Sequence, residues 1–515
     1  MSMNNQGRVT APNEISSATF ESFSGNKALD QATKLIFETG SFKKTGIDFP
    51  KPKGIKYRLG GLEQTKNIEL PGLSEPETLR HYVRLSQKNY AIDLGVYPLG
   101  SCTMKHNPRL NEKVARLPGF SDVHPLQPIA TVQGALELMY ELSNWLTKLC
   151  NMPAVALTPK AGAHGELCGM MTIRARLDAD GNSHKRRVFV PESAHGTNPA
   201  TAVQCGFFVD ELPANDKGCI DMDVLRLKIS DLGSDNDIAG IMLTNPNTCG
   251  LFESDIIEIS ELIHNAGGYF YCDGANFNAL VGRVRPGDLG VDAMHINLHK
   301  TFSTPHGGGG PGSGPTVLSD ALKDYAPIPY VVKDKSGRFD LVEDINDISM
   351  GRLCAFHGQM GMYTRALSYM MSHGSDGLKQ ATEDAVLNAN YILASLSDLM
   401  TPAYSGHCMH EVLFDDTFLQ NTGVDTLDFA KAMIDEGYHP MTMYFPLVVH
   451  GAMLIEPTES ESKYELDRFI TTMRGLANRA KSGDIKSFKS APQHSPTKRV
   501  DETLAARKPV LRYEP

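Results

Sequence analysis

The sequence lacks the features that mark secreted, metal-bound or membrane proteins. Its nine cysteines are scattered and odd in number, and no two of them form a Cys-x-x-Cys pair, which argues against a disulfide framework or a zinc site. No apolar run is long enough to span a bilayer, and the polar segment Met1 to Asn13 has no hydrophobic signal-peptide core. We therefore expect a reduced, cytoplasmic protein with no metal centre and no membrane association.

Positive charge is also sparse. The chain has 50 Lys and Arg against 60 Asp and Glu, which gives a formal net charge of −10. The most basic short run is Lys185-Arg186-Arg187, and no dense basic stripe accompanies it. Proteins that bind nucleic acid need such a stripe to neutralise phosphates, so we expect no nucleic-acid partner. A length of 515 residues allows roughly two to four domains.

The chain divides into three parts by its periodicity. Residues 1–125 are poorly periodic and are broken by Pro and Gly, which predicts an extended N-terminal arm. Residues 126–350 are predicted to form a large domain. Residues 351–515 mix strands with helices, which suits a smaller α+β C-terminal domain, with a helix expected over 360–399 and interrupted near Gly374. Strands are expected there at 410–414, 447–449 and 453–456, a helix at 462–481, and a polar tail after 492 that wraps the surface.

In the middle part, apolar strands alternate with amphipathic helices. Strands are expected at 188–190, 207–209, 238–243 and 269–272, and helices at 131–149, 166–177, 222–232 and 254–265. This alternation predicts an α/β fold with a mostly parallel sheet covered on both faces. Ligands of such sheets bind at the carboxyl ends of the strands. The polar residues placed there are His195, Asn245, Thr248, Asp273 and Lys300.

The stretch from Asp292 to Pro315 delivers one lysine to that edge. Met294, Ile296 and Leu298 alternate with polar residues, which predicts a strand, and Lys300 then enters a glycine-rich loop. A desolvated lysine titrates lower and can form a Schiff base with an aldehyde. Taken alone, the segment fits equally well with a plain strand followed by a flexible loop.

Together these residues predict a site for pyridoxal phosphate. Lys300 would bind the aldehyde, and Asp273 would keep the pyridine nitrogen protonated. His195 could stack on the ring, although a single histidine is more often a structural loop residue. Ala161, Gly162 and Ala163, just before a predicted helix, could offer backbone N–H groups to the phosphate. The hydroxyl of Thr301 or Ser303 would donate a hydrogen bond to the phosphate. Thr248 or Asn245 would donate one to the ring hydroxyl.

Many stretches of the chain are similar to one known family. The sequence resembles the glycine dehydrogenase (decarboxylating) family, the P-protein of the glycine cleavage system, and matches its separate C-terminal-half subunit. The similarity covers nearly the whole chain and is carried by 84–90, 97–105, 117–120, 124–127, 131–142, 161–166, 192–199, 244–250, 273–276, 297–315, 455–459 and 505–510. Residues 1–10 and 180–187 look less typical.

The resemblance implies a pyridoxal-phosphate-dependent transferase of fold type I. The family's cofactor lysine matches Lys300, its ring-stacking histidine matches His195, and the cofactor-binding set extends to Ala275 and His299. Glycine would lose carbon dioxide, and its aminomethyl group would pass to the lipoyl arm of H-protein. The implied assembly is an α₂β₂ heterotetramer with glycine dehydrogenase subunit 1, so the chain would be inactive alone and its arm would pack on a neighbour.

Two alternatives from other classes remain open on the sequence. Another fold type I amino-acid decarboxylase would use Lys300, Asp273 and His195 in the same roles. A non-catalytic scaffold subunit would have a vestigial pocket, and the presence of Lys300 argues against it. The sequence does not identify the residues that bind the glycine carboxylate.

Overall fold

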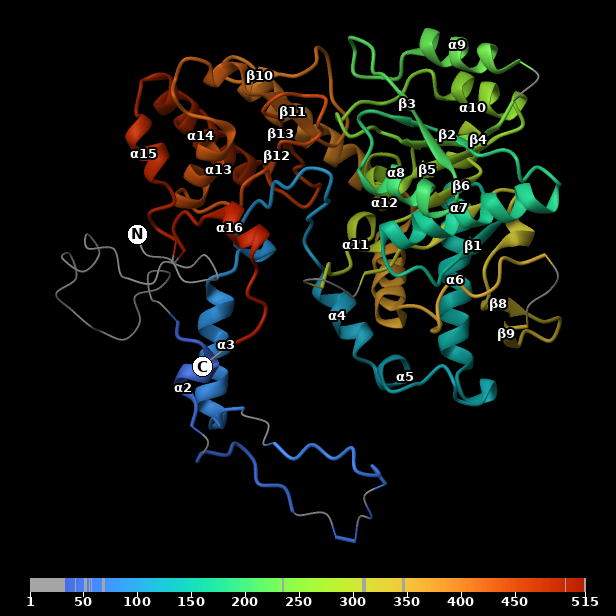
Figure 1. Ribbon diagram of the computed structural model, residues 1–515, viewed down its shortest axis with the longest axis horizontal. Helices are drawn as coiled ribbons and strands as arrows, with labels where there is room; N and C mark the ends of the chain where they lie inside the picture. The colour runs from blue at the N-terminus through green and yellow to red at the C-terminus, as the bar shows by residue number, and fades with distance from the viewer. Residues whose placement is uncertain are drawn as a thin grey trace.

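The computed structural model describes residues 33–513 except 42, 51, 52, 55, 57, 67–69, 234, 235, 308–311, 345–347 and 496. A large body is built on a seven-stranded sheet, and a smaller body on a four-stranded sheet lies beside it (Figure 1). Within the described ranges, no helix combines the length and the apolar character needed to cross a membrane.

The large sheet has the strand order β1-β7-β6-β5-β4-β2-β3. Strands β2 to β6 pair in parallel, whereas β7 runs antiparallel to both β1 and β6. The prediction of a mostly parallel sheet is therefore confirmed. The strand bounds are Ala154–Ala156 (β1), Arg187–Pro191 (β2), Phe208–Leu212 (β3), Ile238–Thr244 (β4), Tyr269–Asp273 (β5), Ala293–His295 (β6) and Thr316–Leu318 (β7).

Helices cover both faces of this sheet, as the alternation predicted. One apolar cluster joins the sheet to α6, α9 and α10, and a second joins its other face to α7 and α8. Burying two continuous apolar faces is the main stabilising contribution in such a layered fold. The helix bounds are Gln133–Cys150 (α6), Gly162–Ala179 (α7), Thr197–Gln204 (α8), Met222–Leu232 (α9) and Ile256–Asn265 (α10).

The long helix α12, Met360–Leu396, links the two bodies. It kinks at Gly374, where φ is 66° and ψ is −175°, a backbone conformation that glycine adopts without a Cβ clash. This is the interruption that the sequence predicted.

The smaller sheet is antiparallel, with the order β10-β11-β13-β12. The strand predicted at 447–449 is wrong. Leu447 is 85% exposed, and the segment forms a turn closed by Tyr444 N–H donating to the carbonyl of Ala452 at 2.8 Å. The bounds are Thr401–Pro402 (β10), Val412–Asp415 (β11), Thr442–Met443 (β12), Met453–Ile455 (β13), Thr426–Asp435 (α13), Lys463–Lys481 (α14) and Ile485–Ser490 (α15).

The N-terminal arm projects from the rest of the molecule between α2 and α3 (Figure 1). Among the described residues between these two helices, five large apolar side chains are exposed: Ile47, Phe49, Leu59, Leu62 and Leu70. The C-terminal tail returns to the arm, where the rings of Phe37 and Tyr513 stack with centroids 4.5 Å apart.

The remaining elements are short or peripheral, apart from helix α3. The helices are α2 (Ile36–Thr39), α3 (Glu75–Gln87), η2 (Ile92–Leu94), α4 (Arg109–Ala115), α5 (Pro118–Ser121), η3 (Ile129–Thr131), η5 (Gly274–Ala279), η6 (Pro286–Leu289), α11 (Leu298–Thr301), η7 (Lys323–Tyr325), η8 (Thr417–Leu419) and α16 (Glu502–Arg507), and the strands are β8 (Tyr330–Lys333) and β9 (Phe339–Val342).

Candidate active site at the strand ends

Lys300 lies on a short helix and not in a glycine loop. The strand predicted through Leu298 is wrong in its second half, because β6 ends at His295 and α11 covers Leu298–Thr301. Beyond β6, two backbone hydrogen bonds still join this segment to the residues before β7. The N–H of Ile296 donates to the carbonyl of Pro315 at 2.7 Å, and the N–H of Leu298 donates to the carbonyl of Ser313 at 3.2 Å. The chain then turns at the sheet edge. Four residues of the glycine-rich run, 308–311, lie outside the described residues.

The segment before α4 reaches the lysine from the N-terminal part of the chain. Lys300 Nζ donates a hydrogen bond of 2.8 Å to the carbonyl oxygen of Ser101. Four residues later, the buried Lys105 donates to the carbonyl of Thr301 at 2.9 Å and to Glu459 Oε1 at 2.5 Å. The loop from Tyr97 to Lys105 therefore joins α11 to the small body, a role that its set of polar residues did not reveal in sequence.

Asp273 ends β5 and is 2% exposed. Its carboxylate accepts hydrogen bonds from Asn198 Nδ2 and from the backbone N–H of Ala275, both at 2.9 Å. Burial alone would raise its pKa, but His295, His195 and these hydrogen bonds outweigh burial and lower the pKa to about 2. The site therefore contains a buried group that stays ionised near neutral pH.

His295 orients this carboxylate, and the sequence reasoning missed it. Its Nε2 lies 3.5 Å from Asp273 Oδ1 and 2.8 Å from Asn297 Oδ1. Its Nδ1 lies 2.6 Å from the hydroxyl of Tyr271. The alternation of apolar and polar residues around β6 could have identified His295, because it places this residue in the strand next to β5.

His195 lies in the turn between β2 and α8. Its ring stacks on Phe445 with centroids 5.1 Å apart and an interplanar angle of 12°. Burial is the main cause that lowers the pKa of His195, although Asp273 opposes it. Among the described residues, its buried Nε2 has no hydrogen-bond partner. The ring is thus flat and neutral, and its stacking on a cofactor stays a prediction.

The start of α7 presents backbone N–H groups that have no acceptor within the helix. The first N–H groups of a helix have no acceptor within it, and no side chain caps this end at Ala161. A Cβ built on Gly162 would lie 2.8 Å from Asn297 Nδ2 and 3.1 Å from His295 Nε2. Glycine is thus needed where the helix end approaches these two side chains, and Ala163 follows it in the first turn.

The alternative hydroxyl and amide donors differ in what they already bind. Ser303 Oγ donates to the carbonyl of His106, and Thr248 Oγ1 donates to the carbonyl of Ser193. Within the described part of the chain, the buried atoms Thr301 Oγ1 and Asn245 Nδ2 have no partner. Each pair of alternatives thus has one side chain already engaged and one whose buried polar atom still needs a partner.

His299 lies against the same helix end. Its Nδ1 accepts the N–H of Ser313 at 3.4 Å, and its Nε2 lies 3.2 Å from Asn297 Nδ2. Burial, with contributions from His306 and Lys300, lowers the pKa of His299 to about 3. It is therefore a neutral residue at physiological pH.

These features fit a group with a basic ring nitrogen, an anion and an aldehyde. The ionised Asp273 suits the nitrogen, the uncapped end of α7 suits an anion, and Lys300 supplies an amine. Buried polar atoms without partners are uncommon in folded proteins, and those of Asn245 and Thr301 can be satisfied by such a group. No other described cluster combines these three parts.

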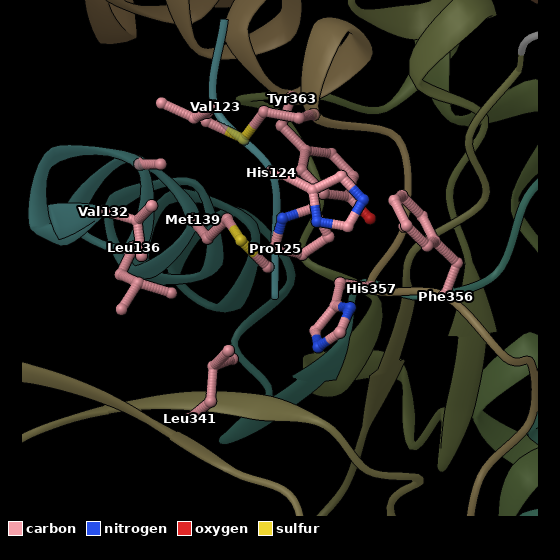
Figure 2. A pocket seen from close by; sticks show the side chains of 13 residues that line it. Val123, His124, Pro125, Val132, Leu136, Met139, Leu341, Phe356, His357 and Tyr363 are labelled. Carbon is pink, nitrogen blue, oxygen red and sulfur yellow. The ribbon is translucent and has the colours of Figure 1, made fainter. Parts of the chain in front are cut away.

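An apolar pocket with a cavity volume of about 70 Å³ lies elsewhere, with His124, Phe356 and His357 along one side (Figure 2). None of the residues discussed above lines it. Two contacts join this pocket to the loop before α7. Lys160 Nζ lies 5.7 Å from the centroid of the Phe356 ring, and Tyr363, which also lines the pocket, donates a hydrogen bond of 2.6 Å to the carbonyl of Leu157.

Solved structures with a similar fold are enzymes. The fold matches a crystal structure of glycine decarboxylase (P-protein) of the glycine cleavage system, in inhibitor-bound form, with a TM-score of 0.68, 19% identity, and coverage of 81% of this chain and 93% of that chain. It also matches a crystal structure of TDC from Oryza sativa with PLP and tryptamine, with a TM-score of 0.62, 11% identity, and coverage of 83% and 92%. The fold is that of pyridoxal-phosphate-dependent enzymes of fold type I.

Sequence comparison is more specific. Residues 381–499 match the family model described as glycine dehydrogenase, C-terminal domain. A protein of Caulobacter vibrioides named probable glycine dehydrogenase (decarboxylating) subunit 2 is 64% identical over 521 residues, covering 100% of this chain and 98% of the relative. The chain therefore belongs to the glycine dehydrogenase (decarboxylating) subunit 2 family.

Proposed function

We propose that this chain is the cofactor-bearing subunit of glycine decarboxylase, the P-protein of the glycine cleavage system. The observation that carries the proposal is the placement of Lys300, in α11 just past β6, and of the ionised, buried Asp273, at the end of the neighbouring strand β5, in a chain 64% identical over its full length to a subunit 2 relative. The substrate is glycine, and the acceptor of its aminomethyl group is lipoylated H-protein.

Pyridoxal phosphate is the cofactor of this proposal. Lys300 would bind its aldehyde, Asp273 would interact with its ring nitrogen, His195 would stack on its ring, and Ala275 would complete this set. The N–H groups of Gly162 and Ala163, at the start of α7 after Ala161, would bind the phosphate, and Thr301 would add a hydroxyl. Asn245 is favoured over Thr248 as donor to the ring hydroxyl because its Nδ2 has no partner among the described residues.

When bound, the cofactor supplies an electron sink for the electrons left by departing carbon dioxide. The chain's own residues prepare that step. Asp273 stays ionised and so holds a proton on the facing nitrogen. His295 and Asn198 hold the carboxylate in place. His299 and His195 are neutral, because burial lowers the pKa of each, so neither adds a competing positive charge beside the ring.

The partner subunit is proposed to be glycine dehydrogenase subunit 1 in an α₂β₂ assembly. The arm supports this, because Phe49 is 81% exposed and Leu62 is 86% exposed. Large exposed apolar surfaces mark interaction sites, and obligate interfaces bury roughly 2,000 Å² or more. The domain boundaries at 125 and 350 remain part of the proposal. A cytoplasmic location is supported by nine cysteines that are all free thiols.

Reduction with borohydride tests the cofactor assignment. The protein loaded with pyridoxal phosphate is reduced, digested and mapped by mass spectrometry. The expected result is one modified peptide that carries the cofactor on Lys300. A modification on another lysine, or none, would contradict the assignment. Dependence of carbon dioxide release on H-protein then distinguishes this activity from that of a decarboxylase that releases free amine.

A further inference from the structure

Two glutamates face each other across the small sheet at its end nearest Lys300. Strands β11 and β13 are antiparallel, and their register pairs Val412 with Ile455. The residues one step further along, Glu411 and Glu456, are therefore opposite each other. Their exposures are 0% and 1%, so both carboxyl groups are shielded from water.

Like charges directly opposite on neighbouring strands are destabilising, and burial in a low dielectric increases that cost. Burial raises the pKa of Glu411 well above its ordinary value, and the neighbouring Glu456 raises it further. Burial likewise raises the pKa of Glu456 to about 7. Two carboxyl groups in contact titrate as a pair, and one proton between them removes the repulsion.

Hydrogen bonds satisfy only some of the carboxylate oxygens of Glu411 and Glu456. Glu411 accepts the N–H of Ser101 at 2.7 Å and, more weakly, Asn276 Nδ2 at 3.4 Å. Glu456 Oε1 accepts the hydroxyl of Thr103 at 2.5 Å. In the described structure Glu456 Oε2 is buried without a partner, which leaves an oxygen able to carry or receive a proton.

Among the described groups around the pair, Lys300 is the cation that has no carboxylate partner of its own. His410 Nε2 lies 3.7 Å from Glu456 Oε1, but burial lowers the pKa of His410 to about 3 and keeps it neutral. Lys105 is paired with Glu459 at 2.5 Å. Lys300 acts electrostatically on both glutamates. The backbone of Ser101 links Glu411 to Lys300, because its N–H donates to Glu411 and its carbonyl accepts from Lys300.

A divalent cation is a less suitable occupant. Atoms of His410, Glu411 and Glu456 lie within 4.8 Å of one another, a spacing that an ion could bridge. Lys300 and Lys105 both act electrostatically on this cluster, however, and their positive charges oppose a further cation.

We propose that Glu411 and Glu456 share one proton, and that the single negative charge they keep stabilises the ammonium form of Lys300 whenever this lysine is not bonded to cofactor. The two glutamates are positioning residues, because they act on the lysine through charge and through Ser101. The proposal rests on the role proposed for Lys300. It explains why an acidic pair is buried at this edge, where a lysine must be released and recaptured in each turnover.

Reductive methylation of the cofactor-free, full-length protein tests the proposal without any glycine assay. Formaldehyde and cyanoborohydride modify only the neutral amine, and peptide mass mapping gives the rate at Lys300 at a fixed pH. The variants are E411Q, E456Q and E411Q/E456Q. The matched control is E461Q, because burial also raises the pKa of Glu461 to about 7 but Lys300 is not among the groups that act on it.

A shared proton predicts a non-additive result. Either single variant keeps one ionised glutamate, so the methylation rate stays within about twofold of the wild type. The double variant removes the charge, and the rate rises roughly tenfold, the effect of one nearby opposite charge. E461Q leaves the rate unchanged. If each single variant raises the rate severalfold, both glutamates are ionised and the proposal is overturned. An unchanged rate in the folded double variant also overturns it.

Circular dichroism verifies that each variant is folded. If E411Q/E456Q does not fold, E411M/E456M carries the test, since apolar residues of similar volume often replace buried charged groups without loss of stability. Failure of borohydride trapping at Lys300 would contradict the proposed function, whereas the methylation result concerns only the acidic pair. The two failures are therefore distinguishable.

Discussion

The side-chain amide of Asn198 lies 2.9 Å from Oδ2 of Asp273 and donates a hydrogen bond to it. This contact ties the first turn of α8 to the carboxyl end of β5. The other oxygen, Oδ1, accepts the N–H of Ala275, so the carboxylate is fixed from two sides. Buried carboxylates without such bonds become protonated. Asn198 is thus a reason why Asp273 stays charged.

Asp273→Asn removes that charge while it keeps the size of the side chain. We expect cofactor binding to persist and turnover to fall by roughly 100-fold or more, in the range seen when a preorganised electrostatic group is lost. Steady-state kinetics and cofactor absorbance measure the two effects. Glu253→Gln is a control, because it alters another buried carboxyl that contacts Asn247 and not the site. Near-normal turnover of Asp273→Asn would refute the assignment.

Lys105→Met should destabilise the protein by about 3–5 kcal/mol, because it leaves the largely shielded carboxylate of Glu459 without its cation. The ion pair is 2.5 Å long, with side-chain exposures of 2% and 10%. Urea unfolding measures the loss. The comparison is Lys463→Ala, which breaks an exposed pair with Asp467 and should cost about 0.5 kcal/mol or less. Equal losses in the two variants would show that burial of the first pair has no energetic importance.

Glu461 predicts a pH dependence of stability. Burial is the main cause that raises its pKa from 4.5 in the unfolded chain to about 7 in the folded one. Between these values the folded state binds more protons, so its stability falls as pH rises. Glu461→Gln should flatten the decline of the melting temperature across that window. Glu112 acts in the opposite direction, because its hydrogen bond with Arg365 lowers its pKa and its contribution to stability is lost as pH falls. Glu112→Gln should therefore flatten the loss of stability on acidification.

His195→Ala should weaken cofactor retention by up to about tenfold, the value of one aromatic stacking contact. His195→Phe should restore retention better than turnover, since phenylalanine keeps the flat ring but lacks Nε2. Equilibrium dialysis against pyridoxal phosphate measures retention. If the alanine variant keeps the wild-type affinity, the imidazole does not stack on the ring.

The sequence predicted those parts of the site that depend on local pattern. Asp273 follows an apolar run that could only be a buried strand, and strand ends in a parallel sheet meet at one edge. Lys300 was placed at the correct edge but on the wrong element. Apolar and polar residues continue to alternate past His295, but the regular pairing of β6 with β7 stops at that residue. The alternation of side chains does not show where strand pairing ends.

The acidic pair and the Lys105–Glu459 contact were not predictable. Their partners are separated by 45 and 354 positions in the chain. The first pair forms through the register of β11 and β13, and the second through the contact of the segment before α4 with the small body. The sequence does not distinguish a charged residue that is buried from one that lies on the surface. The choice between Thr248 and Asn245 also needed the structure, since it depends on a hydrogen bond to Ser193.

The arm predicts where the partner binds. Phe49→Ser with Leu62→Ser should abolish co-purification with subunit 1 and leave the melting temperature of this chain unchanged, because both side chains are exposed. Leu447→Ser is the matched control, since Leu447 is as exposed but lies on the small body. Co-purification that survives the double change would place the interface elsewhere.

Exchange of the glycine carboxyl group with labelled bicarbonate tests the central claim most directly. The assay compares this chain alone, the chain with subunit 1 and lipoylated H-protein, and the same mixture with Lys300→Ala. The account predicts exchange only in the complete mixture with the wild-type chain. Exchange by the complete mixture with Lys300→Ala, or by this chain with H-protein but without subunit 1, would contradict it.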